Sequence, residues 1–84
     1  MSEAELEKIE AAKVVDARGS ACPGPLLEAK KGVGAVKVGE ILEVQSNDAG
    51  SRTDIAIWAK KVGHEYLGHI EAAGYDRHFI CRRK

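Results

Sequence analysis

The sequence has few of the residues that would cross-link a small domain or draw it to a charged partner. Its 84 residues include only two cysteines, Cys22 and Cys81, and this wide separation without a signal-peptide pattern favours free thiols. Thirteen basic residues balance thirteen acidic ones, which argues against a general attraction to nucleic acid or membrane. No apolar run reaches the length of a membrane span. We therefore expect one cytoplasmic domain with no membrane partner and no direct nucleic-acid partner.

One of the two cysteines stands beside both prolines of the chain, in the run Cys22-Pro23-Gly24-Pro25. Each proline fixes φ near the helical value, lacks an N–H that a first helical turn leaves unpaired, and favours extended geometry in the preceding residue. We therefore expect a helix to begin between Pro23 and Pro25, with Cys22 just outside it. A helix N-terminus stabilises a thiolate over a thiol, so Cys22 is the candidate catalytic nucleophile.

The alternation of apolar residues and turn signals predicts the order βαβαββ. Strand-helix-strand crossovers are right-handed, so we predict an α/β fold: a two-layer α/β sandwich with a four-stranded mixed sheet and two helices on one face. Residues 1–13 are expected to be an N-terminal tail or a short helix, followed by one domain at 14–84. The expected strands are 14–17, 40–46, 66–72 and 77–82. The expected helices are 51–62, capped by Ser51 and Gly63, and 25–37, with an earlier end near Lys31 as the alternative because Gly32 and Gly34 weaken helix propensity.

A hairpin loop at 74–75 predicts that Ile70 pairs with Phe79 and that Gly68 pairs with Cys81. This set is the more apolar one, so we expect it to form the core face beneath the helices. Cys81 would then be an inert buried thiol.

Other side chains have structural interpretations. His69 and His78 are expected on the solvated face of the hairpin, with a partner surface or an adventitious metal site as the alternative. Trp58 lies on the apolar stripe of the second helix together with Ile55 and Val62, and is expected in the core. Asp48 and Asp54 are expected to cap that helix rather than to act as acid or base.

Spacing narrows the chemistry open to Cys22. The second cysteine of a C-x-x-C pair would stand at Pro25, which argues against a dithiol oxidoreductase. Acyl transfer needs a nearby base, and no spacing supports a pair with His64, His69 or His78. Structural zinc sites bring ligands in close pairs, which the chain lacks, so we predict no metal and no cofactor. Single-thiol group transfer, such as sulfur relay through a persulfide, remains one option among several.

Two stretches of the chain resemble the TusA/SirA-type sulfur carrier family. The family pattern Asp-x-Arg-Gly-x-x-Cys-Pro-x-Pro is matched by Asp16-Ala17-Arg18-Gly19-Ser20-Ala21-Cys22-Pro23-Gly24-Pro25. The second similar stretch contains Asp48, Asp54-Ile55, Trp58 and Gly63-His64. Together with the element order, the resemblance covers about residues 14–83.

The resemblance implies a two-layer sandwich related to the C-terminal domain of bacterial translation initiation factor three. It also implies a sulfurtransferase in which Cys22 carries a persulfide from a donor protein, a cysteine desulfurase or a rhodanese, to an acceptor protein. In this family the acceptors lead to tRNA thiolation, molybdenum cofactor maturation or sulfur oxidation.

Residues around the thiol have supporting roles in this hypothesis. Pro23, Gly24 and Pro25 shape the helix start. Arg18 either orients the persulfide anion or meets a partner, or is a solvated charge in a turn. Asp16 is expected to bond the backbone of residues 18–20.

Two other functions remain open on the residues alone. One is a non-enzymatic regulatory module that senses redox state through Cys22 or binds RNA or protein, and the neutral charge counts against RNA. The other is a thiol peroxidase or dithiol enzyme in which Cys81 resolves Cys22.

Overall fold

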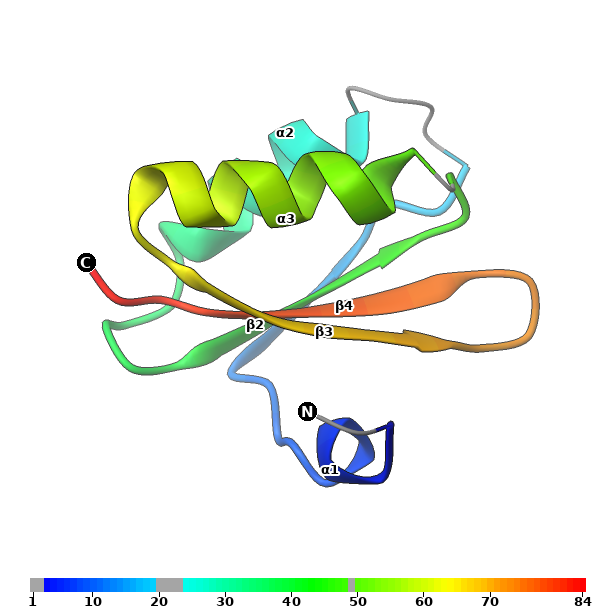
Figure 1. Cartoon of the computed structure of the whole chain (residues 1–84), viewed down its shortest axis with the longest axis horizontal. Helices are drawn as coiled ribbons and strands as arrows, with labels where there is room; N and C mark the ends of the chain where they lie inside the picture. Colours follow the sequence, from blue (N-terminus) through cyan, green and yellow to red (C-terminus); the bar gives the residue numbers. More distant parts are fainter. Residues whose placement is uncertain (1–2, 20–23, 49) are drawn as a thin grey trace.

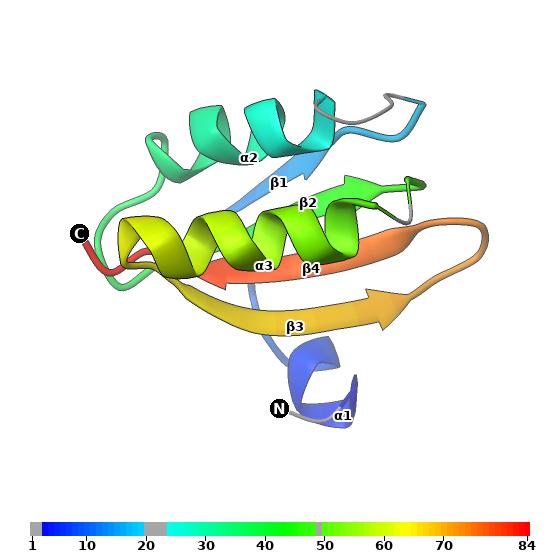
Figure 2. The ribbon, with the colours of Figure 1, turned by 45° about the horizontal axis from the view of Figure 1, so that its top comes forward.

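The computed structural model describes residues 3–19, 24–48 and 50–84. These residues form a four-stranded sheet with the strand order β1-β2-β4-β3, in which β1 and β2 are parallel and the other neighbours are antiparallel. Helices α2 and α3 cover one face of the sheet, and the short α1 lies against the other (Figures 1 and 2). In chain order the elements are α1 Glu3–Glu7, β1 Lys13–Asp16, α2 Gly24–Val33, β2 Ile41–Ser46, α3 Ser51–Val62, β3 Glu65–Glu71 and β4 Asp76–Cys81.

This architecture confirms the predicted α/β class and the four-stranded mixed sheet with two helices on one face. The main core lies between the sheet and the pair α2 and α3. Its strand residues include Leu42, Val44 and Ile80, and its helix residues include Ala29 and Ile55. Among the described residues, no helix has both the length and the apolar character needed to cross a membrane.

Helix α2 approaches the sheet so closely that one turn of it requires a glycine. The sequence predicted that glycines would interrupt this helix, yet α2 passes through Gly32 and ends at Val33. A Cβ on Gly32 would lie 2.8 Å from a methyl carbon of Leu42 and 2.9 Å from one of Val15. The glycine weakens helix propensity but permits the close contact between the two layers.

The predicted start of α3 needs correction, whereas its end is confirmed. Gly50, not Ser51, occupies the N-cap position, and no side chain caps it. The Ser51 side chain is buried and lies 3.4 Å from the hydroxyl oxygen of Ser46, because it faces the sheet. At the other end Gly63 adopts a φ of 88°, the left-handed conformation of a helix-ending glycine.

The predicted pairing of the hairpin is wrong by two residues. Ile70 pairs with Arg77, and Gly68 pairs with Phe79. The turn is centred one residue earlier than predicted, since the Ala72 N–H donates to the Tyr75 carbonyl at 2.7 Å and the loop is therefore 73–74 rather than 74–75. A β-bulge between Tyr66 and Gly68 then shifts the pairing by one further residue.

The predicted core face of the hairpin is also wrong. Phe79 and Ile70 lie on the face covered by α1, where they pack with Leu6. The face beneath α2 and α3 instead carries Ile80 and the fully buried His78, which was expected to be solvated. The alternation of residues along the two strands correctly assigned Ile70 and Phe79 to one face and His78 and Ile80 to the other. Alternation alone does not show which of the two faces the longer helices cover.

Candidate functional site

The chain on both sides of the candidate nucleophile is described, although Cys22 and Pro23 themselves lie outside the described residues. On one side β1 ends at Asp16, and on the other α2 begins at Gly24. The predicted helix start between Pro23 and Pro25 is therefore confirmed. Cys22 precedes the first residue of α2 by two positions.

The turn after β1 is held by a two-pronged contact between Arg18 and Asp16. The guanidinium donates from Nε and Nη2 to the two carboxylate oxygens at 2.9 and 3.0 Å, and the Arg18 backbone N–H donates at 3.1 Å. These hydrogen bonds lower the pKa of Asp16 to about 2. The guanidinium also lies over the ring of Tyr75, 4.9 Å from its centre. Asp16 therefore bonds the turn backbone as predicted, and Arg18 is engaged with protein groups.

A second loop supports the same segment. The Gly19 N–H donates to Oδ1 of Asn47 at 2.9 Å, and the Ala17 N–H donates to the carbonyl of Gln45 at 2.8 Å. Asn47 follows β2 directly, and β1 and β2 are parallel. Their carboxyl ends therefore meet, so the loop leading to Cys22 rests on the loop after β2.

Sequence reasoning missed two residues of this support. In the sequence Asn47 has only the character of a turn residue after the second strand, and Tyr75 that of a hairpin-loop residue. The parallel pairing could have indicated Asn47, because residues that follow neighbouring parallel strands lie at one end of a sheet. No local pattern indicated Tyr75, whose contact with Arg18 depends on the order of the strands.

The two predicted capping residues lie near the start of α3, but neither caps the helix through its side chain. Asp48 accepts a hydrogen bond from the Gly50 N–H at 3.1 Å, and its own N–H donates to the Ser46 hydroxyl at 3.1 Å. Asp54 lies in the first turn of α3, where a carboxylate is favoured by the helix dipole. Asp48 therefore shapes the loop before α3 and Asp54 interacts favourably with its dipole, whereas the predicted side-chain cap is wrong.

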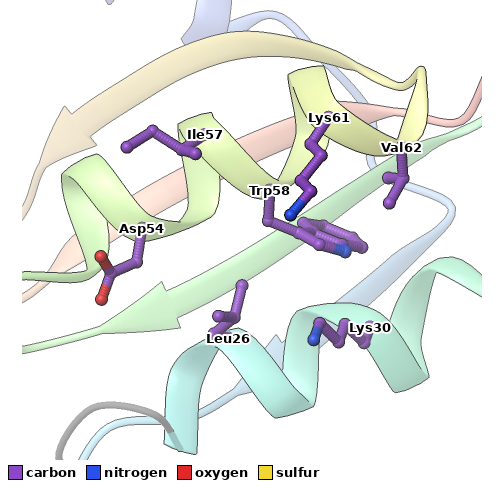
Figure 3. A pocket seen from close by; sticks show the side chains of 7 residues that line it. All are labelled: Leu26, Lys30, Asp54, Ile57, Trp58, Lys61 and Val62. Carbon is purple, nitrogen blue, oxygen red and sulfur yellow. The ribbon is translucent and has the colours of Figure 1, made fainter.

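An apolar groove of about 590 Å³ lies between α2 and α3 (Figure 3). Its apolar lining comes from Leu26 on α2 and from Ile57, Trp58 and Val62 on α3. Trp58 thus lies at the border of the core instead of inside it, and Val62, predicted on the buried stripe, is exposed. Lys30, Asp54 and Lys61 add charge to the rim.

His64 and His78 make different contacts in the structure. Nδ1 of His64 accepts from the Arg83 N–H at 3.1 Å, and its ring meets Trp58 edge to face. His78 is buried, with Nδ1 2.8 Å from the Tyr66 hydroxyl, and its Nε2 has no partner among the described residues. Burial lowers the pKa of His78 to about 4 and raises that of Tyr66 to about 12. Both groups are therefore neutral near pH 7.

One cluster on the described residues has metal-ligand geometry. Atoms of His69, Glu71 and Asp76 lie within 4.8 Å of one another. Arg52 already donates to both Asp76 oxygens at 2.7 and 3.0 Å and to Glu71 at 3.1 Å. These hydrogen bonds from Arg52 hold the pKa of Asp76 below its ordinary value. The guanidinium supplies the positive charge of this cluster, so the arrangement functions as an ion-pair network.

Cys81 is buried, as predicted, but on the α1 side of the sheet. Its Sγ lies 3.7 Å from the carbonyl oxygen of Gly39, and it pairs with Ile41 at the start of β2. The segment that leads to Cys22 lies beside Asn47, at the other end of β2. The fold thus separates Cys81 from that segment by the length of a strand.

Comparison with known proteins shows which family this chain resembles. The family described as Sulfurtransferase TusA matches residues 13–82. A candidate sulfur carrier protein of Archaeoglobus fulgidus is 60% identical over 71 residues, which cover 84% of this chain and 97% of that protein. The sulfur carrier protein TusA of Allochromatium vinosum is 38% identical over 69 residues, which cover 82% of this chain and 90% of that protein.

Two further similarities concern a longer relative and a solved structure. The candidate sulfur carrier protein YrkF of Bacillus subtilis is 46% identical over 67 residues, which are 80% of this chain but only 36% of that protein. The crystal structure of a SirA-like protein from Desulfitobacterium hafniense matches with a TM-score of 0.69 and 27% identity, covering 86% of this chain and 99% of that one. The chain belongs to the TusA family of sulfurtransferases.

Proposed function

We propose that this protein is a sulfur-relay protein in which Cys22 alternates between a thiolate and a persulfide. The observation that carries the proposal is the start of α2 at Gly24, two positions after Cys22. The N–H groups of a first helical turn and the helix dipole favour a thiolate at such a position. Pro25 has no N–H, but no hydrogen bond of the helix is lost, because the N–H groups of a first helical turn have no partner within the helix.

The transfer requires no change in overall oxidation state. The Cys22 thiolate attacks the terminal sulfur of a donor persulfide, a new sulfur–sulfur bond forms on Cys22, and the donor cysteine leaves as a thiolate. The acceptor repeats the attack and restores the Cys22 thiolate. The donor is a cysteine desulfurase or a rhodanese in this proposal, and the acceptor serves tRNA thiolation, molybdenum cofactor maturation or sulfur oxidation in the cytoplasm.

Residues before the thiol act as positioning groups in this proposal. Asp16 and Arg18 fix the turn, and Asn47 fixes Gly19, so the segment that leads to Cys22 starts from a defined geometry. The burial of Cys81 supports a relay with one thiol over a disulfide mechanism.

Intact-mass analysis after incubation with inorganic polysulfide tests the proposal. We expect one added sulfur on the wild type and on Cys81→Ser, and none on Cys22→Ser. Absence of loading on the wild type, or equal loading of the two variants, would contradict it. Alkylation against pH adds a second readout: Cys22 should react first, with a pKa below that of an ordinary thiol.

A further inference from the structure

We propose that the groove between α2 and α3 binds a short amphipathic helix of an acidic partner protein. This inference rests on the proposed function, because it assigns a docking surface to the protein that exchanges sulfur with Cys22. The groove was not indicated by the sequence, which placed Trp58 in the core and Val62 on the same apolar stripe.

The groove exposes apolar side chains that the fold itself does not cover. Ile57 is 60% exposed and Val62 is 40% exposed, and both line the groove from α3. Leu26 reaches it from α2, and the Trp58 ring extends from α3 toward the same space (Figure 3). A continuous apolar surface with charged residues at its rim is typical of a protein-binding site.

The charges around the groove select the partner. Lys30 and Lys61 line it from the last turns of the two helices, and Asp54 is the one carboxylate in the described lining. Within the described ranges, no carboxylate forms an ion pair with Lys30 or Lys61. The whole chain has no net charge, so this is a local excess of positive charge that complements acidic residues.

The shape of the groove favours a helix as the occupant. α2 has ten residues and α3 has twelve, so the groove walls extend for about 15 Å at 1.5 Å per residue. A helix of about three turns fits that length and presents apolar residues at i, i+3, i+4 and i+7. The groove begins at Leu26, four positions after Cys22, so a docked helix would deliver the adjoining part of the partner to the thiol.

The test uses three designed peptides of about three helical turns with one shared leucine face and Glu, Gln or Lys beside it. Trp58 is the only tryptophan of the chain and lines the groove, so its fluorescence reports occupancy. We expect saturable binding with affinity in the order Glu, Gln, Lys, the first and last differing by about tenfold or more. The double variant Lys30→Glu/Lys61→Glu should reverse this order.

A pair of equally exposed residues gives the matched control. Ile57→Asp should weaken binding of the Glu peptide about tenfold or more, whereas Val38→Asp should leave it unchanged. Val38 is 61% exposed and lies outside the groove, so both variants remove a similar exposed apolar side chain.

Equal effects of the two variants, equal affinity for the three peptides, or no binding would overturn the proposal. Self-association of the protein that Ile57→Asp abolishes would assign the groove to a second copy and overturn it too.

Polysulfide loading separates this inference from the proposed function. Ile57→Asp should load sulfur on Cys22 as the wild type does, because the small donor needs no docking surface. Failure of peptide binding with normal loading would remove the groove proposal alone. Failure of loading with normal peptide binding would remove the relay function and leave the groove as a binding site.

Discussion

The two faces of the sheet are covered by helices of very different size. One face lies beneath α2 and α3, of ten and twelve residues, and the other lies against α1, of five residues. The larger cover lies within the segment matched by the family, residues 13–82, and α1 lies outside it. In this chain Phe79 and Ile70 are therefore covered by Leu6, a residue outside the matched segment.

The largest expected effect comes from the face beneath the two longer helices. Leu42 is fully buried there, and Leu42→Ala should lower the free energy of unfolding by about 3–4 kcal/mol. Urea denaturation measures the loss. Val14→Ala, at an exposed position of the neighbouring strand, should change stability by less than about 0.5 kcal/mol. A loss at Leu42 no larger than at Val14 would mean that this face does not hold the main core.

The buried His78 on the same face should make the free energy of unfolding depend on pH. Burial lowers the pKa of His78 to about 4, below the unfolded value of about 6.5, so the folded state binds the proton less readily. Stability present above pH 6.5 should therefore fall by about 2–3 kcal/mol as the pH drops from 6.5 to 4. Urea midpoints across this range measure the slope.

His78→Leu is the control, because it should remove the slope between pH 6.5 and 4. The groups that influence His78 are Asp76, His69 and Arg52. The pKa of Asp76 is itself below its ordinary value, so its contribution is lost only at lower pH. A slope that survives in His78→Leu would assign it to another group.

The α1 face should give a smaller and more local effect. Leu6 is 2% exposed and packs with Phe79 and Ile70, but it belongs to a five-residue helix that can detach by itself. Leu6→Ala should cost about 1–2 kcal/mol and raise binding of a hydrophobic dye. Hydrogen exchange should rise in residues 3–9 and stay slow in β2, while the exposed Lys8→Ala should change neither. Faster exchange throughout the sheet would show that α1 is integral to the main core.

The smallest expected effect tests how closely α1 approaches β3. Gly68 has a φ of 133°, and a Cβ there would lie 3.2 Å from a methyl carbon of Leu6. Gly68→Ala should cost about 1 kcal/mol or somewhat more, and part of the cost should disappear in the Leu6→Ala background. Gly74, with a φ of 81° and open space around it, gives the control for backbone strain alone. Identical losses in both backgrounds would exclude the contact with Leu6.

The sequence predicts the parts of this fold that depend on neighbours along the chain. Helix α3 follows from its apolar period and from Gly63, and the start of α2 follows from the prolines. The bulge near Gly68 and the burial of His78 were missed, because both depend on contacts between elements distant in sequence.

In the candidate site, too, local features can be predicted from the sequence, whereas contacts between distant elements cannot. The run from Asp16 to Pro25 is local, so its motif and its place before a helix can be read directly. Asn47 and Tyr75 join it through the sheet order, and the groove needs two helices side by side. Periodicity alone could not separate a buried Trp58 from one at a groove, since both lie on an apolar stripe.

The bulge in β3 also bears on solubility. β1 and β3 are the two edge strands, whose outer N–H and C=O groups can template pairing with another chain. β1 offers only four residues, and the irregularity between Tyr66 and Gly68 breaks the regular ladder of β3. Both edges are thus poor templates, and the protein should resist edge-to-edge aggregation even at high concentration.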